Sequence, residues 1–252
     1  MNIQPIPEKI LIIPYRDRQS HKDFFINHMN KYFKDEKGIE MYFIHQLDKR
    51  SFNRGAMKNI GFLTMKNKYP DNYKNITFIF HDIDTLPRHD DIIPYNTSHG
   101  SVAHYYGTTF ALGGIVAIKG GDFEKIKGFP NYWGWGMEDN MLQERCIENN
   151  IKIDRSVFYP MEDKNNIIRL FDGFKRVANM REPSIYKYES SDTLYDIRNV
   201  KWKLDKEFVH VLDFNTGRPY SSTEIRNWDI RSGKHMDIPK GYCRKNWSMK
   251  LL

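Results

Sequence analysis

The sequence has few cysteines and no long hydrophobic run. Only two of its 252 residues are cysteines, Cys146 and Cys243, which excludes a scaffold built on disulfides and favours a reducing compartment. The longest apolar run near the N-terminus covers only Ile10 to Pro14. Such a run is too short for the core of a signal peptide or for a transmembrane helix. We therefore expect a soluble or cytoplasmic protein with no membrane span.

Internal repeats, low-complexity linkers and nucleic-acid-binding motifs are also missing. The net charge of +7 is spread along the chain, so it suits a phosphate-bearing ligand, and we expect no nucleic-acid partner. Hydrophobic residues make up 40% and aromatic residues 14% of the chain, which excludes a disordered protein. We expect one domain over residues 1–215, with a C-terminal extension at 216–252 packed on it.

Alternating strand and helix patterns predict an open α/β fold. Apolar runs typical of strands occupy residues 9–15, 38–47, 76–84 and 113–120. Helical spacing of apolar residues occupies residues 18–33, 53–69 and 138–150. The alternation predicts parallel βαβ units, hence a mostly parallel, Rossmann-like sheet flanked by helices. After residue 160 the pattern indicates polar loops and weak helix, followed by a strand pair at 199–215.

Two arginines follow the first predicted strand. Arg16 and Arg18 lie where an open α/β sheet binds its ligands, at the carboxyl end of a strand. Paired guanidinium groups beside a helix N-terminus suit a phosphate by charge and by geometry. The alternative is that they pair with local acids such as Asp17.

Two aspartates end the third predicted strand. Asp82 and Asp84 are separated by one residue, and alternate side chains of a regular strand share a face. Two carboxylates so close repel each other unless a cation lies between them. Mn²⁺ or Mg²⁺ fits such a site and usually also binds phosphate oxygens. The alternative is a solvated strand end.

The stretch GFPNYWGWGMEDN, residues 128–140, places aromatic residues between glycines directly before two acids. Glycines on both sides of Trp135 allow it to swing as a lid over a substrate, and an indole face can stack on a sugar ring. Asp139 or Glu138 can then accept a proton from a hydroxyl. The alternative is an aromatic turn packed on the core.

Together these motifs resemble the β-1,4-galactosyltransferase family, glycosyltransferase family 7 with a GT-A fold. The matching stretches, in the family order over roughly residues 9–200, are IIPYRDRQSH, FNRG, HDIDTLP and GFPNYWGWGMED. The resemblance implies metal-dependent, inverting transfer of galactose or an N-acetylhexosamine from a UDP-sugar. The implied acceptor is a sugar hydroxyl of a glycan or glycoconjugate, and the implied cofactor is Mn²⁺, with Mg²⁺ as its substitute.

The resemblance also implies a role for individual residues. Asp84 would bind the metal with Asp82, and Asp139 would be the catalytic base beside Glu138. The implied nucleotide contacts are Pro14, Arg16, Arg18, Phe52, Arg54, Asp82 and Trp135. The implied sugar pocket consists of Ala111, Gly113, Gly114, Trp135, Glu138 and Asp139.

The sequence departs from the family pattern at two sites. The family completes its metal site with a histidine after the tryptophan loop, but the corresponding stretch here, SVFYPMEDKNN, has none. Either Met161, Glu162 or Asp163 substitutes, or a distant histidine such as His210 does, or metal binding is weak. In addition, Ala111 replaces an aromatic residue that closes the donor pocket near the sugar C2, which leaves room for an N-acetyl group.

Two other functions remain open at this point. The pairs His81-Asp82 and His89-Asp90 suggest a metal-dependent phosphohydrolase, although such pairs usually lie on helices. A non-catalytic carbohydrate-binding relative without its metal site is the other alternative.

Overall fold

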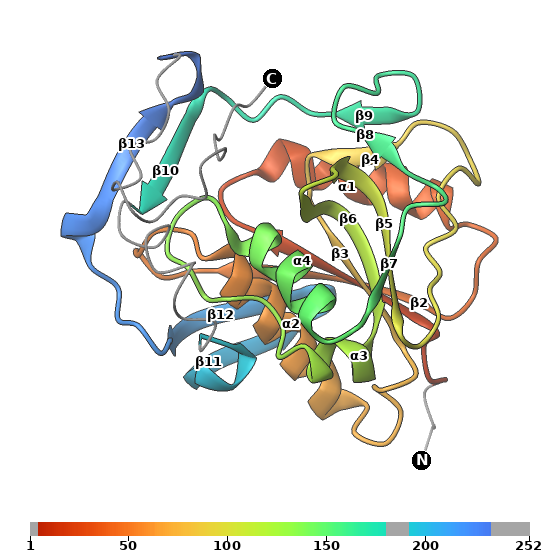
Figure 1. Ribbon diagram of the computed structural model, residues 1–252, viewed down its shortest axis with the longest axis horizontal. Helices are drawn as coiled ribbons and strands as arrows, with labels where there is room; N and C mark the ends of the chain where they lie inside the picture. Colours follow the sequence, from red (N-terminus) through yellow and green to blue (C-terminus); the bar gives the residue numbers. More distant parts are fainter. Residues whose placement is uncertain (1–4, 180–191, 233–252) are drawn as a thin grey trace.

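The computed structural model describes residues 5–179 and 192–232 (Figure 1). Cys243 and most of the expected extension, residues 233–252, lie outside the described residues. Over the part of the chain that is described, no helix is both long and apolar enough to cross a membrane.

A nine-stranded sheet forms the centre of the molecule, with strand order β11-β12-β2-β1-β3-β6-β5-β7 and β8 paired with β5. Its strands are β1 (Lys9–Tyr15), β2 (Ile39–Gln46), β3 (Thr77–His81), β5 (Ser101–Thr108), β6 (Ala111–Lys119), β7 (Lys152–Asp154), β8 (Tyr159–Pro160), β11 (Arg198–Asp205) and β12 (Phe208–Asn215). β11 and β12 confirm the strand pair predicted near residues 199–215.

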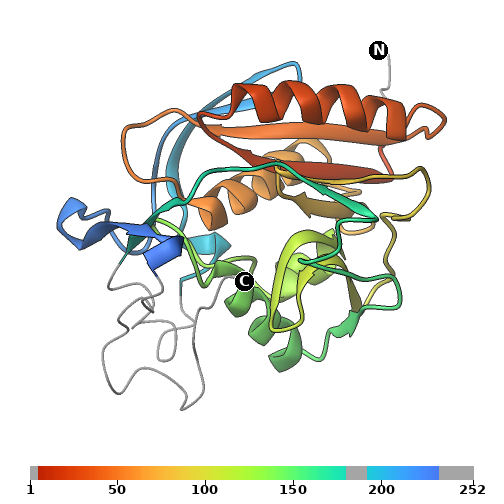
Figure 2. The ribbon, with the colours of Figure 1, turned by 90° about the horizontal axis from the view of Figure 1, so that it is seen from above.

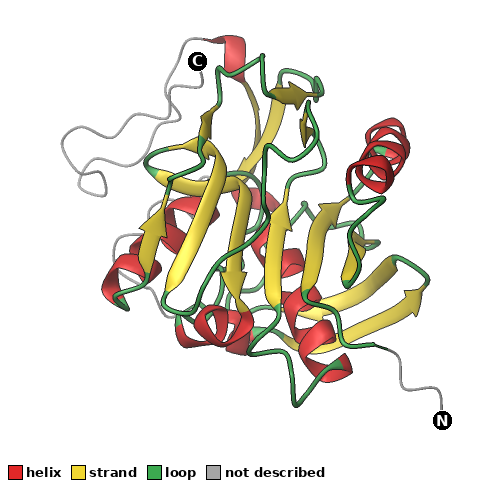
Figure 3. Cartoon of the chain, turned by 90° about the vertical axis from the view of Figure 1, so that its right-hand side faces the viewer, coloured by secondary structure: helices red, strands yellow, loops and turns green. Residues whose placement is uncertain are grey.

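Helices cover both faces of this sheet, as Figures 2 and 3 show. They are α1 (Gln19–Tyr32) on one face and α2 (Arg54–Lys68), α3 (Gly120–Lys125) and α4 (Glu138–Glu148) on the other. Ile10 and Ile12 of β1 pack on the α2 side, and Leu11 and Ile13 pack on the α1 side. Because both faces are covered, β1 is buried throughout, and its residues Ile10 to Pro14 form a continuous apolar run. The predicted α/β fold is confirmed.

The sheet is more mixed than the alternating pattern predicts. β1 runs parallel to β2 and β3, and β12 runs parallel to β2. β6, however, is antiparallel to both β3 and β5. The sequence pattern missed β5, and the two residues Thr109 and Phe110 join β5 to β6 in a hairpin. β5 runs in the same direction as β3, since both are antiparallel to β6. The hairpin then reverses the chain, so β6 runs against β3.

The third predicted strand ends earlier than expected. β3 stops at His81, and Asp82 and Asp84 lie in the turn that follows. The amide of Asp82 donates to the carbonyl of Gly114 at 2.9 Å, and the amide of Thr85 donates to the carbonyl of Asp82 at 3.4 Å. The expectation that alternation along a strand aligns the two acids was therefore wrong, because turn geometry places them.

The prediction of weak helix after residue 160 is also wrong, because this segment forms short strands. β9 (Ile167–Arg169) pairs with β4 (Thr85–Pro87). β10 (Lys175–Asn179) pairs with β13 (Ile225–Asp229) in a two-stranded ribbon beside the main sheet (Figure 1). The described residues also contain 3-10 turns at η1 (Leu194–Asp196), η2 (Ser222–Glu224) and η3 (Ile230–Ser232).

Candidate active site

A cavity of about 410 Å³ lies beyond the carboxyl end of β3. It brings together all the residues of the expected sugar pocket: Ala111, Gly113, Gly114, Trp135, Glu138 and Asp139. Asp82, Asp84 and Arg54 line the same cavity. Residues from three of the four sequence motifs, together with the start of β6, therefore meet at one site.

The expected nucleotide contacts line two adjoining hollows. The smaller hollow is lined by Pro14, Arg16, Arg18, Phe52, Arg54, Asp82, Ile83 and Asp84. The larger one, of about 380 Å³, lies between this group and the ribbon and is lined by Trp135 among others. The guanidinium of Arg54 lies 5.9 Å from the centre of the Phe52 ring. The smaller hollow thus combines three arginines with one aromatic ring, a composition that suits an anionic ligand with a flat base.

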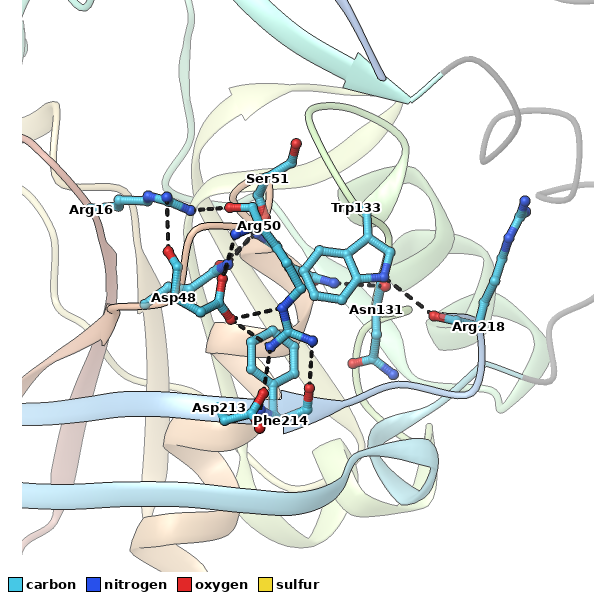
Figure 4. A network of polar contacts seen from close by, with 11 residues as sticks. Arg16, Asp48, Arg50, Ser51, Asn131, Trp133, Asp213, Phe214 and Arg218 are labelled. Atoms are coloured by element: carbon cyan, nitrogen blue, oxygen red, sulfur yellow. Dashed lines mark hydrogen bonds and ion pairs between the residues drawn. The ribbon is translucent and has the colours of Figure 1, made fainter. Parts of the chain in front are cut away.

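Arg16 is held by the loop before Phe52. Its guanidinium donates to the carbonyl of Asp48 at 3.0 Å and to the carbonyl of Arg50 (Figure 4). It also lies 3.4 Å from the carboxylate of Asp17. Arg16 therefore fixes the loop that presents Phe52, in addition to lining the cavity.

Arg50 anchors the tryptophan loop, residues 128–137, from below (Figure 4). Its guanidinium lies 4.8 Å from the Trp133 ring centre and 4.6 Å from the Phe214 ring centre. The two rings stack on each other with centres 5.3 Å apart, so the guanidinium lies beside the stacked pair. The Trp133 side chain is fully buried, and its indole nitrogen donates to the carbonyl of Arg218 at 3.3 Å. Trp133 is thus the core-packed part of this loop, whereas Trp135 lines the cavity.

Trp135 is attached to the β10–β13 ribbon. Its amide donates to the carbonyl of Val177 at 2.7 Å, and its ring stacks on Trp228 of β13 with centres 5.8 Å apart. The preceding Gly134 has φ +91°, and a Cβ there would lie 2.8 Å from the Val177 carbonyl oxygen. Only glycine fits this close approach. The sequence did not indicate that the C-terminal part of the chain supports the loop.

A chain of ion pairs runs along the side of the cavity that carries Asp84. Arg18 lies 3.4 Å from Asp84 and 3.1 Å from Asp172, and Asp172 lies 2.8 Å from Arg176. Burial and the neighbouring Asp82 carboxylate raise the pKa of Asp84, and Arg18 opposes this rise. Sequence reasoning missed Asp172 and Arg176, because they belong to the segment whose strands it did not recognise.

The carboxylates of Asp82 and Asp84 supply hard oxygen donors, which suit Mn²⁺ or Mg²⁺. Glu162 lines the same cavity, whereas the Asp163 carboxylate accepts from the amides of its own turn. His210 lies on β12, with its Nδ1 3.3 Å from that of His45. Within residues 5–179 and 192–232, no three His, Cys, Asp or Glu side chains form a ready cluster. The residues therefore fit a cation bound by two carboxylates and completed by other oxygen ligands.

Glu138 and Asp139 begin helix α4. The residue before them, Met137, has a left-handed backbone with φ 77°, which turns the chain from the loop into the helix. Glu138 is buried, and Oδ1 of Asp139 accepts from the ammonium of Lys58 at 2.9 Å. Burial raises the pKa of Asp139 to about 7. The Lys58 ammonium opposes this rise and the Glu138 carboxylate adds to it.

The first histidine-aspartate pair does not form a hydrolytic site. His81 is fully buried, and its ring bonds to the carbonyl of Asp82 at 2.9 Å and to the hydroxyl of Tyr95 at 3.1 Å. Burial lowers the pKa of His81 to about 4. His81 is therefore a core residue with both ring nitrogens engaged.

Comparison with known proteins agrees with this geometry. The family described as the N-terminal region of glycosyl transferase group 7 matches residues 2–97, and the N-terminal domain of galactosyltransferase matches residues 98–170. The chain belongs to the β-1,4-galactosyltransferase family.

Members of the β-1,4-galactosyltransferase family resemble this chain over a little more than half its length. β-1,4-galactosyltransferase 4 of Cricetulus griseus is 29% identical over 179 residues, which cover 64% of this chain and 51% of the relative. β-1,4-galactosyltransferase 1 of Mus musculus is 33% identical over 161 residues, covering 59% and 39%. The chain thus spans about half the length of the curated family members it matches.

A solved galactosyltransferase shares the fold. Drosophila β-1,4-galactosyltransferase 7, in a complex with manganese, UDP-Gal and xylobiose, superposes with a TM-score of 0.63 at 20% identity. The match covers 82% of this chain and 94% of that one. The mixed sheet with helices on both faces is therefore the GT-A fold of the galactosyltransferases.

Proposed function

We propose that this protein is a metal-dependent, inverting glycosyltransferase. It moves galactose or an N-acetylhexosamine from a UDP-sugar to a sugar hydroxyl of a glycan or glycoconjugate. The observation that carries this proposal is a single cavity lined by Trp135, by Asp82 and Asp84, and by the Glu138-Asp139 pair. Membership of the galactosyltransferase family and the manganese and UDP-Gal bound to the Drosophila relative support it.

The donor site is assigned to the side of the cavity with the cations. Arg18 and Arg54 offer guanidinium groups to the diphosphate, and Phe52 offers its ring to the uracil. Asp84, with Asp82, would hold Mn²⁺ or Mg²⁺, and Glu162 lies close enough to the cavity to add a ligand. A bound divalent cation would offset the negative charge that develops on the leaving diphosphate.

The chain's own residues perform the remaining chemistry. Trp135 covers the donor and excludes water. Asp139 accepts the proton of the acceptor hydroxyl, and the freed oxygen forms a bond to C1 of the donor sugar. The bond between C1 and the diphosphate oxygen breaks, and its electron pair leaves with UDP. Glu138 holds the acceptor sugar beside Asp139.

We also propose that residues 1–215 form the glycosyltransferase domain and that residues 216–252 are an extension packed on it. In the described part of this extension, Tyr220 packs on Trp133 with ring centres 5.1 Å apart. Strand β13 pairs with β10, which also supports packing of the extension on the domain.

Removal of the metal tests the proposed function directly. Exhaustive chelation is expected to reduce transfer from a UDP-sugar to background, and excess Mn²⁺ is expected to restore it. Transfer to simple glycosides, followed by UDP release, is the measurement, with Mg²⁺ as a second cation. Full activity after chelation would contradict a metal-dependent mechanism.

The identity of the donor sugar depends on Ala111. This small residue begins β6 and lines the cavity with Gly113 and Gly114, whereas the neighbouring Leu112 points into the core. We expect the protein to use UDP-N-acetylgalactosamine at least as well as UDP-galactose. Ala111→Tyr would overpack the pocket near C2, which costs about 1–3 kcal/mol, or about ten- to a hundredfold in preference for the plain hexose.

Competition between the two donors for the wild-type protein and for Ala111→Tyr measures this preference. Phe110 lines the rim of the cavity and is 57% exposed, so Phe110→Ala is the control for an occluding neighbour. Strong exclusion of the N-acetyl donor by the wild-type protein would contradict the open pocket.

A further inference from the structure

Lys58 is a buried lysine directly behind the cavity. It lies on α2, whose residues Ala56, Met57 and Ile60 are also buried, so its side chain, 3% exposed, does not reach solvent. Within the described residues, its ammonium has one hydrogen-bond acceptor, Oδ1 of Asp139 at 2.9 Å. An unpaired charge in such a place would be very unfavourable. The position of Lys58 therefore depends on an ionised Asp139.

The surroundings hold Lys58 in place. Its ammonium lies 4.5 Å from the centre of the Phe129 ring, a cation–π contact at the base of the tryptophan loop. Helix α2 approaches this loop closely, because a Cβ at Gly55 would overlap the carbonyl oxygen of Pro130 at 1.9 Å. The start of α2 is fixed by Asn53, whose side chain accepts from the Ala56 amide. The contact between Lys58 and Asp139 is therefore fixed by the packing of helix α2 against the base of the tryptophan loop.

The two oxygens of Asp139 have different environments. Oδ1 faces Lys58, whereas Oδ2 lies against Gly113, where a Cβ would be only 2.5 Å away. Gly113 and Asp139 both line the cavity. Oδ2 is therefore on the Gly113 side of the carboxylate and is the oxygen that Lys58 leaves free.

We propose that Lys58 is a positioning residue for sugar transfer: its ammonium fixes Oδ1 of Asp139 and keeps the carboxylate ionised, which leaves Oδ2 to take the proton of the acceptor hydroxyl. This inference rests on the proposed function. The other charged groups that act on Asp139 are Glu138 of its own helix, Asp82 after β3 and Arg54 of α2. The Glu138 and Asp82 carboxylates favour a protonated Asp139, whereas Lys58, the cation that contacts it, favours the ionised form.

The role of Lys58 predicts how kcat for sugar transfer depends on pH. Asp139 must be ionised to accept a proton, so transfer is lost as the pH falls through its pKa, which burial raises to about 7 and Lys58 opposes. In Lys58→Met the opposing charge is gone, and the acidic limb of the kcat profile is expected to move up by about 1–3 pH units. At pH 7, kcat then falls by about five- to five-hundredfold and recovers at higher pH, while the KM for the donor is unchanged.

The experiment compares Lys58→Met with Lys58→Arg, which keeps the cation, and with Lys66→Met, which removes a partly exposed lysine of the same helix that pairs with Glu124. The Asp139 carboxyl is titrated by ¹³C NMR, assigned with Asp139→Asn, and kcat is measured against pH in parallel. We expect the titration midpoint to rise in Lys58→Met, to change much less in Lys58→Arg and to stay constant in Lys66→Met.

The two readouts separate this inference from the proposed function. An unmoved Asp139 midpoint, or a kcat lost equally at every pH, would overturn the role of Lys58 even in an active transferase. A midpoint that rises in Lys58→Met, in a wild-type protein that transfers no sugar, would support the coupling of Lys58 to Asp139 and would refute the proposed function instead.

Discussion

Asp139→Asn is expected to lower kcat for sugar transfer by about a hundred- to ten-thousandfold while donor binding changes little. Asn has the shape of Asp, and its carbonyl oxygen can still accept from the ammonium of Lys58, 2.9 Å from Oδ1 in the native protein. It cannot take the proton of the acceptor hydroxyl. The chemical step is therefore lost while the cavity keeps its form. Single-turnover transfer rates and calorimetric titration with UDP measure the two effects separately.

The matched control is Glu148→Gln, the same chemical change at an exposed position of the same helix. This variant is expected to behave as the wild-type protein. If Asp139→Asn retained near-normal rates, Asp139 would be a structural acid at the start of the helix. The proton acceptor would then have to be Glu138, which also lines the cavity.

Asp84→Ala is expected to remove metal-dependent nucleotide binding, and Asp82→Ala to weaken it less. A divalent cation contributes several kcal/mol to the stabilisation of the leaving group, so loss of its main ligand should lower kcat by at least about a hundredfold. Arg18 keeps its second partner, Asp172, at 3.1 Å, so the ion-pair network survives the change. Calorimetric titration with UDP, in Mn²⁺ and in chelator, measures the effect.

Asp90→Ala serves as the control, because Asp90 is an exposed aspartate in the loop that follows. Its Mn²⁺-dependent affinity for UDP is expected to equal that of the wild-type protein. An Asp84→Ala variant with the same Mn²⁺-dependent affinity would place the metal on other side chains of the cavity, with Glu162 the first to examine.

The central strands were predictable because their burial is written into their composition. β1 is apolar from Ile10 to Pro14, since helices cover both of its sides. Strand direction was not predictable, because an apolar run reads the same in either direction. β6 was therefore expected in a parallel unit, and it forms a hairpin with β5 instead. In β5, His104 is followed by Tyr105, Tyr106 and Gly107. The strand therefore shows neither an alternation of apolar and polar residues nor a continuous aliphatic run.

The candidate site was predictable where short motifs carry its chemistry. Asp84, Trp135 and Asp139 all lie in one cavity, although they come from separate stretches of the sequence. Their partners were not predictable, because each lies far along the chain. Trp135 stacks on Trp228, for example, and no local pattern announces a contact between a loop and a distant ribbon.

The sequence contained a clue to the role of Lys58 that the sequence analysis did not use. Helix α2 is buried on most of its circumference, so a lysine in its middle has no route to solvent. Such a lysine needs an acid inside the protein. The sequence contains many acids, and only the packing of α2 under the tryptophan loop selects Asp139.

The position of β12 beside β2 has a consequence for how the chain is made. Phe43 and Ile44 of β2 are aligned with Phe208 and Val209 of β12, so one side of β2 has no partner until the late part of the chain leaves the ribosome. A nascent chain exposes that apolar edge to its neighbours in the meantime, and such edges pair between molecules. Once β12 is added, the outermost strand is β11, which is largely exposed and lysine-bearing. Charges of this kind discourage further strand pairing. The β11–β12 hairpin therefore replaces an apolar edge that can pair with other molecules by a charged edge that resists such pairing.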